Sequence, residues 1–227
     1  MHCGGKCDKV RIGYKNQYLY VESLVSVMKL DLIRKTVSSA GGIAKTADLV
    51  AAGISKSTLR ELAENGTLLR VRHGYYQLAD DIDISEAQYL AALLPEGIIC
   101  VESALFYYGY SDFTPREWTI AVPRTIPLTK LKFDVVPIRP YFIQKEAMEI
   151  GKTEALFDGT ALSIYDRERT ICDCFKYRTK LDSELFGKAI NAYVADTKKN
   201  LGNLSIYAKK LGIYKRVMDL MEVMLGG

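Results

Sequence analysis

Hydrophobic side chains in the first third of the chain recur at helical spacing in three successive segments. Ile33, Val37 and Ala40 follow steps of three and four residues, and Leu59 and Leu62 do the same further on. Glycines separate the segments, because glycine adopts the left-handed conformation of a helix end at little cost. We therefore expect three short helices, over residues 28–39, from Thr46 to Gly53, and from an N-cap at Ser55 to Asn65.

The pattern then changes to the alternation that is typical of strands. In T-L-L-R-V-R-H-G-Y-Y-Q-L, residues 67–78, Leu69 and Val71 alternate with basic residues, and the His-Gly pair indicates a tight turn. We expect Leu69 and Val71 to hold this hairpin against the helices. Three helices followed by a β-hairpin predict a winged helix–turn–helix domain over residues 28–79.

Beyond this hairpin, short strands are grouped between helical segments. Strands are expected over residues 118–123, 132–138, 154–157 and 161–165, with a hairpin turn at Asp158-Gly159. Helices are expected over residues 85–94, 102–109, 167–179 and, as two or three helices, 182–225. This grouping predicts an α+β domain over residues 80–227. The expected fold class is α+β: an N-terminal winged helix–turn–helix, then an α+β domain ending in a helical segment.

The segment before these elements, residues 1–27, shows no clear period. We expect a disordered extension there and a natural start at Met28. His2, Cys3 and Cys7 are not followed by a second ligand pair at zinc spacing, so we expect no metal site. An arm that reaches into a nucleic-acid groove is the alternative, because the segment carries four basic residues.

Composition is ordinary for a soluble globular protein: 227 residues, 48% apolar and 26% charged. The sequence contains neither an apolar run long enough to span a bilayer nor the pattern of a secretory signal, so we expect a cytoplasmic protein with no membrane partner. The five cysteines are odd in number and are not spaced as a disulfide framework, which favours reduced thiols.

Positive charge is concentrated near the N-terminus. Residues 28–79 contain eight basic and four acidic side chains, whereas residues 80–227 contain nineteen basic and twenty-one acidic ones. This distribution is typical of a nucleic-acid-binding module joined to a neutral domain, although a charge fluctuation gives the same counts.

The third helix and the hairpin contain the residues expected to face DNA. The first turn of a helix in the major groove meets bases and phosphates, and a basic wing gains from the negative potential of the minor groove. The alternatives are a simple helix cap and a solvated basic face. The candidates from this argument are Ser55, Lys56, Ser57, Thr58, Arg60, Arg70, Arg72 and His73.

The stretch G-G-I-A-K-T-A-D-L-V-A-A-G-I-S-K-S-T-L-R-E-L-A-E-N-G-T-L-L-R-V-R-H-G-Y-Y-Q-L resembles the N-terminal domain of the AbiEi-type antitoxins of type IV, abortive-infection toxin–antitoxin systems. The likeness continues more loosely into S-A-L-F-Y-Y-G-Y-S-D-F-T-P-R-E-W-T-I-A-V-P-R and D-R-E-R-T-I-C-D-C-F. It implies a repressor that binds repeats in its own promoter, as double-stranded DNA, and that counters a nucleotidyltransferase-like toxin, with or without a direct complex. It adds Lys45 and Thr46 to the DNA-facing candidates.

The resemblance also singles out Arg169, Thr170 and Asp173 as matches to a family motif. Because Arg169 and Asp173 lie four residues apart on one expected helix, we expect an ion pair inside the fold, with a functional site as the alternative.

Two other classes of function are the alternatives to DNA binding. An enzyme is disfavoured, because His2 and His73 are the only histidines and no phosphate-binding glycine motif occurs; we expect neither catalytic residues nor a cofactor. A ligand-sensing regulator is the alternative, with a small-molecule pocket in the C-terminal domain. Its aromatic candidates are Phe106, Tyr107, Tyr108, Tyr110, Phe113 and Trp118, which are equally typical of a core.

Overall fold

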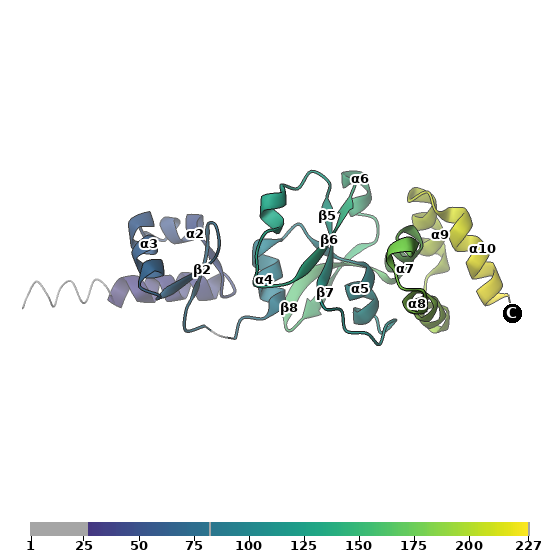
Figure 1. Cartoon of the computed structure of the whole chain (residues 1–227), viewed down its shortest axis with the longest axis horizontal. Coiled ribbons are helices and arrows are strands. Elements are labelled where there is room, and N and C mark those ends of the chain that lie inside the picture. The colour runs from purple at the N-terminus through teal and green to yellow at the C-terminus, as the bar shows by residue number, and fades with distance from the viewer. Residues whose placement is uncertain (1–26, 82, 227) are drawn as a thin grey trace, which may run out of the picture. The chain divides into compact units, whose positions relative to one another are not determined.

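The computed structural model describes residues 27–81 and 83–226 and divides the chain between Ile84 and Ser85 into two compact units (Figure 1). Each unit is described by itself below. The expectation for residues 1–27 lies outside the described residues, apart from Val27. The division falls five residues beyond the boundary expected at residue 79.

In its described residues, the N-terminal unit consists of three helices and a three-stranded sheet. Its elements are a first helix over residues 27–39, β1 (Ala44–Lys45), α2 (Thr46–Ala51), α3 (Lys56–Glu64), β2 (Leu68–Arg72) and β3 (Tyr75–Leu78). The strand order is β1-β3-β2, and both pairings are antiparallel. This is a winged helix–turn–helix, with β2 and β3 as the wing, so this part of the expected fold is confirmed. Strand β1 was not expected, because two residues are too few to show a period.

The core of this unit lies between the helices and the sheet. It consists of Ile33, Val37, Ala44, Leu49, Ile54, Leu59, Leu68 and Leu78. The prediction that Leu69 and Val71 hold the wing was wrong. Leu68 is the buried residue, Leu69 is 47% exposed and Val71 is half-buried. Successive side chains of a strand point to opposite faces, so Leu68 takes the inward position that was predicted for Leu69.

The C-terminal unit contains a five-stranded mixed sheet and most of the helices. Its strands are β4 (Ile98–Ile99), β5 (Trp118–Pro123), β6 (Ile138–Ile143), β7 (Lys152–Phe157) and β8 (Thr160–Tyr165), in the order β6-β5-β4-β8-β7. Its α-helices are α4 (Glu86–Leu93), α5 (Val101–Tyr107), α6 (Lys145–Met148), α7 (Arg167–Lys176), α8 (Ser183–Ala195), α9 (Leu201–Lys210) and α10 (Tyr214–Leu225). Two short 3-10 helices, η1 (Leu128–Leu131) and η2 (Arg178–Lys180), complete it.

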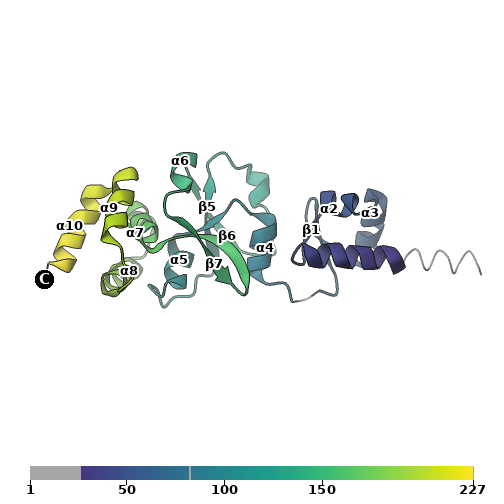
Figure 2. The same cartoon turned by 180° about the vertical axis from the view of Figure 1, so that it is seen from behind.

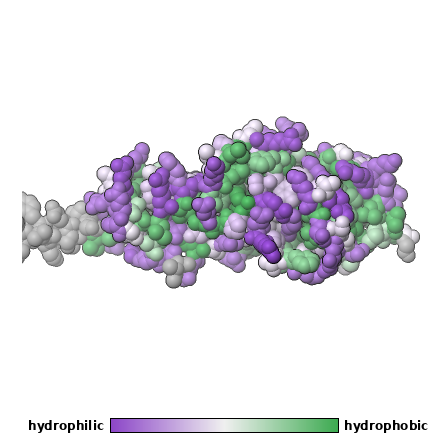
Figure 3. Space-filling model, viewed as in Figure 1, coloured by the Kyte–Doolittle hydropathy of each residue, from purple (hydrophilic) through white to green (hydrophobic). Residues whose placement is uncertain are grey.

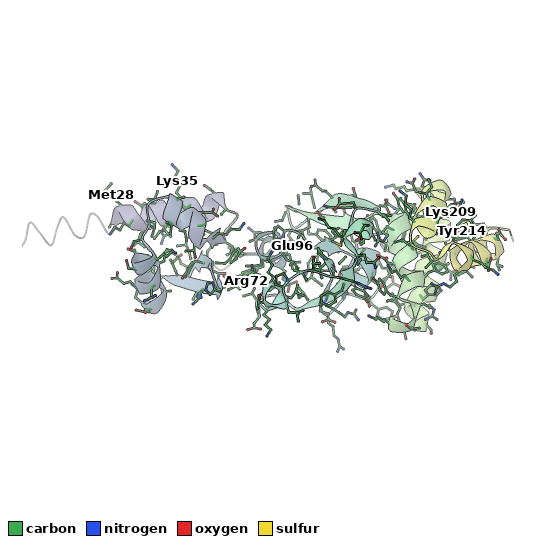
Figure 4. The ribbon with its side chains drawn as sticks, turned by 90° about the horizontal axis from the view of Figure 1, so that it is seen from above. Met28, Lys35, Arg72, Glu96, Lys209 and Tyr214 are labelled. Atoms are coloured by element: carbon green, nitrogen blue, oxygen red, sulfur yellow. The ribbon has the colours of Figure 1, made fainter. Side chains whose placement is uncertain are left out.

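Helices cover both faces of this sheet. Helix α4 packs against β8 on one side, and α5 lies on the other side with α7 behind it, as Figures 1 and 2 show from front and back. Helices α8, α9 and α10 gather around α7, so one continuous core joins them to the sheet. At the outer end, the Lys209 ammonium lies 4.8 Å from the centre of the Tyr214 ring (Figure 4). The α+β class with a helical C-terminal segment is confirmed.

The prediction of a strand over residues 132–138 was wrong. The sheet instead takes β6, which begins at Ile138, where the parallel pairing with Trp118 of β5 starts. Pro137 cannot donate a ladder hydrogen bond, and its carbonyl accepts one from the Trp118 amide at 2.9 Å. Pro140 is tolerated within β6 because β6 is an edge strand of the sheet.

Candidate nucleic-acid interface

Helix α3 begins at a network of hydroxyl groups. The Ser55 hydroxyl accepts a hydrogen bond from the Thr58 amide at 3.1 Å, so Ser55 is the N-cap. The same oxygen lies 2.7 Å from the Ser57 hydroxyl and 2.9 Å from the Thr58 hydroxyl. The sequence predicted that these three side chains contact DNA. In the structure they form hydrogen bonds with one another and fix the start of the helix. Their DNA contacts stay a prediction.

The wing is anchored to the start of α2. The Thr46 amide donates to the Gly74 carbonyl at 2.8 Å, and Gly74 takes the positive φ of 83° that a tight turn needs. The pairing register of β2 with β3 shifts between Arg70 and Arg72. The Arg72 guanidinium lies 4.5 Å from the centre of the Tyr75 ring, a cation–π distance.

One groove brings half of the ten DNA candidates together. It has a volume of about 1090 Å³ and lies between α2, α3 and the wing. The candidates that line it are Thr46, Lys56, Arg60, Arg70 and His73. Helix α3 and the wing therefore present basic side chains to the same concave surface, which we call the basic groove.

The remaining candidates do not line the basic groove. They are Lys45, Ser55, Ser57, Thr58 and Arg72. Lys45 is exposed on β1, opposite Tyr75 of β3. These five side chains are exposed or half-buried, and the structure does not bring them into the groove.

The floor of the basic groove is formed by small apolar side chains that sequence reasoning missed. Ala47, Val50 and Ala51 of α2 line it, as does Ala63 of α3. Val50 is 41% exposed. Figure 3 shows hydrophilic side chains projecting from this unit, with apolar ones between them. Small side chains at every third or fourth position were the available signal, because they leave room for close approach by a partner.

Charges in the basic groove are left open to a partner. Within the described part of the chain, Lys56, Arg60 and Arg70 form no ion pair. One acidic side chain, Glu64, also lines the groove. Three cations against one carboxylate give the groove a net positive field, which favours a polyanion.

The Arg169, Thr170 and Asp173 motif lies inside the C-terminal unit. The Arg169 guanidinium donates to an Asp173 carboxylate oxygen at 3.1 Å, and both side chains are fully buried. The Thr170 hydroxyl donates to the Tyr165 carbonyl at 3.3 Å. This arrangement is the internal ion pair that the spacing predicted, and none of the three side chains reaches the surface.

The described residues also bear on other classes of protein. Over residues 27–81 and 83–226, no group of three or more His, Cys, Asp and Glu side chains is placed to hold a metal ion. Within the same ranges, no helix has both the length and the apolar character needed to span a bilayer. Cys100, Cys172 and Cys174 are buried free thiols, and burial raises the pKa of Cys172 to about 12.

Comparisons with known proteins agree with this geometry. Residues 31–79 match the family model described as "Transcriptional regulator, AbiEi antitoxin". None of the curated proteins matches the chain. The crystal structure of the RV2827C protein from Mycobacterium tuberculosis is similar, with a TM-score of 0.54 and 17% identity over 79% of this chain and 71% of that one, a likeness that shows the fold alone. The winged helix–turn–helix and the family match cover the same part of the chain, so the N-terminal domain is similar to the AbiEi antitoxin family of transcriptional regulators.

Proposed function

We propose that the protein binds the promoter of its own operon as a transcriptional repressor, through the basic groove and the wing. The single observation that carries this proposal is the convergence of Lys56 and Arg60 from α3 with Arg70 from β2 on one surface. A regulator whose basic side chains converge without ion-pair partners is suited to phosphates. The family of the N-terminal domain supports the same role.

In the proposed complex, α3 enters the major groove of double-stranded DNA and the wing lies along the adjacent backbone or minor groove. Lys56 and Arg60 would contact phosphates or base edges, and Arg70 and His73 would contact the strand beside them. Ser57 and Arg72 would extend this surface at its margin. The apolar floor formed by Ala47 and Val50 would allow close approach without leaving polar groups unpaired.

Fluorescence anisotropy with a labelled duplex from the promoter tests this proposal. We expect the affinity to fall steeply as salt rises, because each contacted phosphate releases counterions. A scrambled duplex of the same length should bind more weakly, since base contacts carry specificity. Equal affinity for the two duplexes at all salt concentrations would reject the repressor assignment.

We further propose that the C-terminal unit counters a nucleotidyltransferase-like toxin encoded beside it, so that the protein is an antitoxin without a catalytic step of its own. The family description of the N-terminal domain supports an antitoxin role. The protein would act in the cytoplasm, where its promoter and its toxin are found. A direct complex with the toxin is not required for this proposal.

Coexpression of the neighbouring gene tests the antitoxin role. Full-length protein should restore growth, and a variant with Lys56, Arg60 and Arg70 all changed to Ala should also restore growth while losing repression of a promoter reporter. That outcome would separate the two roles. Failure of the unchanged protein to restore growth would contradict the antitoxin role and leave the DNA-binding role standing on its own test.

A further inference from the structure

The C-terminal unit contains an aromatic pocket that neither DNA binding nor the helical core explains. It has a volume of about 390 Å³ and is formed by α5, β5 and β7, together with the start of α4. The residues that matter for its chemistry are Phe106, Tyr107, Trp118, Phe157, Glu86 and Glu117. A volume of this size is typical of a small-molecule site.

The aromatic rings that line this pocket have their planes inclined to one another. The Trp118 and Phe157 ring centres lie 5.3 Å apart with their planes 70° apart, and Tyr107 lies 4.9 Å from Phe157 at 43°. Phe106 is 44% exposed and Tyr107 is 42% exposed. Exposing two large neighbouring aromatic rings to solvent costs free energy, and a bound ligand that covers the rings would recover it.

Negative charge lies at the edge of the rings. A carboxylate oxygen of Glu86 accepts a hydrogen bond from the Trp118 indole N–H at 2.6 Å, which fixes the Trp118 ring and enriches its face in electron density. Within the described residues, this indole is the only partner of the Glu86 side chain, so its second oxygen is open. Glu117 is already paired, because the Arg139 Nε lies 3.2 Å from its carboxylate.

Of the residues that the structure describes, none with a basic side chain lines this pocket. We propose that it binds an organic cation, specifically a guanidinium group, which stacks on the rings and donates to the open oxygen of Glu86. A guanidinium is flat, stacks on aromatic faces and carries N–H donors in a fork that matches a carboxylate. A quaternary ammonium would stack equally well and leave Glu86 without a donor, so the carboxylate selects the guanidinium.

The guanidinium has two possible sources, a free small molecule or an arginine side chain of a partner protein. Trp118 is the only tryptophan of the chain, so its fluorescence reports on this pocket alone. The full-length protein is titrated with agmatine as the free cation and with N-acetylarginine N-methylamide as the peptide form. The neutral counterpart is N-acetylcitrulline N-methylamide, which has the same shape without the charge.

We expect a saturable change in Trp118 fluorescence with agmatine, with the arginine amide or with both, and none with the citrulline amide. Saturation by agmatine alone would identify a free small molecule, and saturation by the arginine amide alone would identify a partner's arginine. Glu86→Gln should weaken binding by about tenfold or more, because it removes a charge-assisted contact and keeps an acceptor for the Trp118 indole. Glu154→Gln is the control, since Glu154 is exposed on β7 outside the pocket.

Calorimetry with the same compounds checks the affinities independently of fluorescence. Three results would overturn the proposal: no saturation by either guanidinium compound, equal binding of the citrulline amide, or the same affinity in Glu86→Gln as in Glu154→Gln. Each result can be read separately from DNA binding, because none of the residues changed lies in the N-terminal unit.

Discussion

Arg169 and Asp173, one turn apart on α7, form an ion pair of 3.1 Å with neither side chain exposed to solvent. The same guanidinium donates to the carbonyls of Ala147 and Ile150 at 2.7 and 2.8 Å. Arg169 therefore ties α7 to α6 and to the segment that joins α6 to β7. Its role is to hold the C-terminal unit together, which accounts for a motif that the sequence could equally assign to function.

Breaking this pair from one side should destabilise the protein strongly. Arg169→Met leaves Asp173 buried without its partner, which should lower the free energy of unfolding by about 3–5 kcal/mol. The double change Arg169→Met with Asp173→Leu should cost less than Arg169→Met alone, because no buried charge remains. Urea unfolding followed by circular dichroism measures both values, and a double variant less stable than the single one would contradict a buried pair.

The contact between Gly151 and α7 gives a second test of the same region. Gly151 has a φ of 70°, and a Cβ added there would lie 2.5 Å from the Cβ of Arg169. Gly151→Ala should therefore lower the free energy of unfolding by about 3 kcal/mol or more, from backbone strain and overpacking together.

Gly159→Ala is the matched control, because Gly159 has a φ of 79° with nothing within 4 Å of the added Cβ. It should show the strain alone, about 1–2 kcal/mol. Thermal or urea unfolding compares the two variants. Equal losses would mean that the close approach of Gly151 to α7 is absent in solution.

We expect Asp196 to make a contribution to the stability of the fold that is lost at acid pH. The Tyr110 hydroxyl donates to it at 2.6 Å, the Lys198 amide at 2.7 Å and Arg167 at 2.9 Å, and these hydrogen bonds lower the pKa of Asp196 below its ordinary 3.8. A lowered pKa in the folded state stabilises the fold above the ordinary value, and this stabilisation is lost as the pH falls through the folded-state pKa.

The stability difference between the unchanged protein and Asp196→Asn should therefore be largest near neutral pH and should shrink as the pH falls below 3.8. Urea unfolding at a series of pH values measures it. A difference that stays constant across that range would show that the Asp196 carboxylate is not held by these donors.

Variants of the hydroxyl network at the start of α3 can distinguish a helix-capping role from a role in DNA contact. Ser55→Ala removes the N-cap and should cost about 0.5–2 kcal/mol of stability. Ser57→Ala leaves the cap in place and should change stability by less than about 0.5 kcal/mol. Both variants are then measured for promoter affinity after correction for the folded fraction. A loss of affinity in Ser57→Ala at unchanged stability would assign the Ser57 hydroxyl to the interface.

Much of the N-terminal unit follows from local residue chemistry. Ser55 acts as the N-cap that its position predicted, and Gly53 and Gly74 adopt the positive φ values that their turns require. These features could be predicted because capping and turn preferences depend on neighbouring residues alone. The hairpin at Asp158-Gly159 follows for the same reason, since both residues take positive φ values.

Features that depend on distant residues could not be predicted. The phase of β2 is set by its pairing with β3, which buries Leu68 rather than Leu69. The start of β6 is set by its parallel register with β5, a pairing that no local signal in residues 132–138 reveals. The basic groove needs α2, α3 and the wing to be placed together, so its apolar floor was not visible in the sequence.

The central claim, that the basic groove holds DNA, is tested most directly by two charge-matched variants. Arg60→Ala with Arg70→Ala removes two cations of the groove. Lys29→Ala with Lys35→Ala removes two exposed cations of the first helix, where Figure 4 shows Lys35, and leaves the groove intact.

Promoter affinity is measured by fluorescence anisotropy for both variants across a series of salt concentrations. The groove variant should bind at least about tenfold more weakly, with the salt slope reduced by about 2, whereas the helix variant should stay close to the unchanged protein. Equal affinities and equal slopes for the two variants would contradict the account.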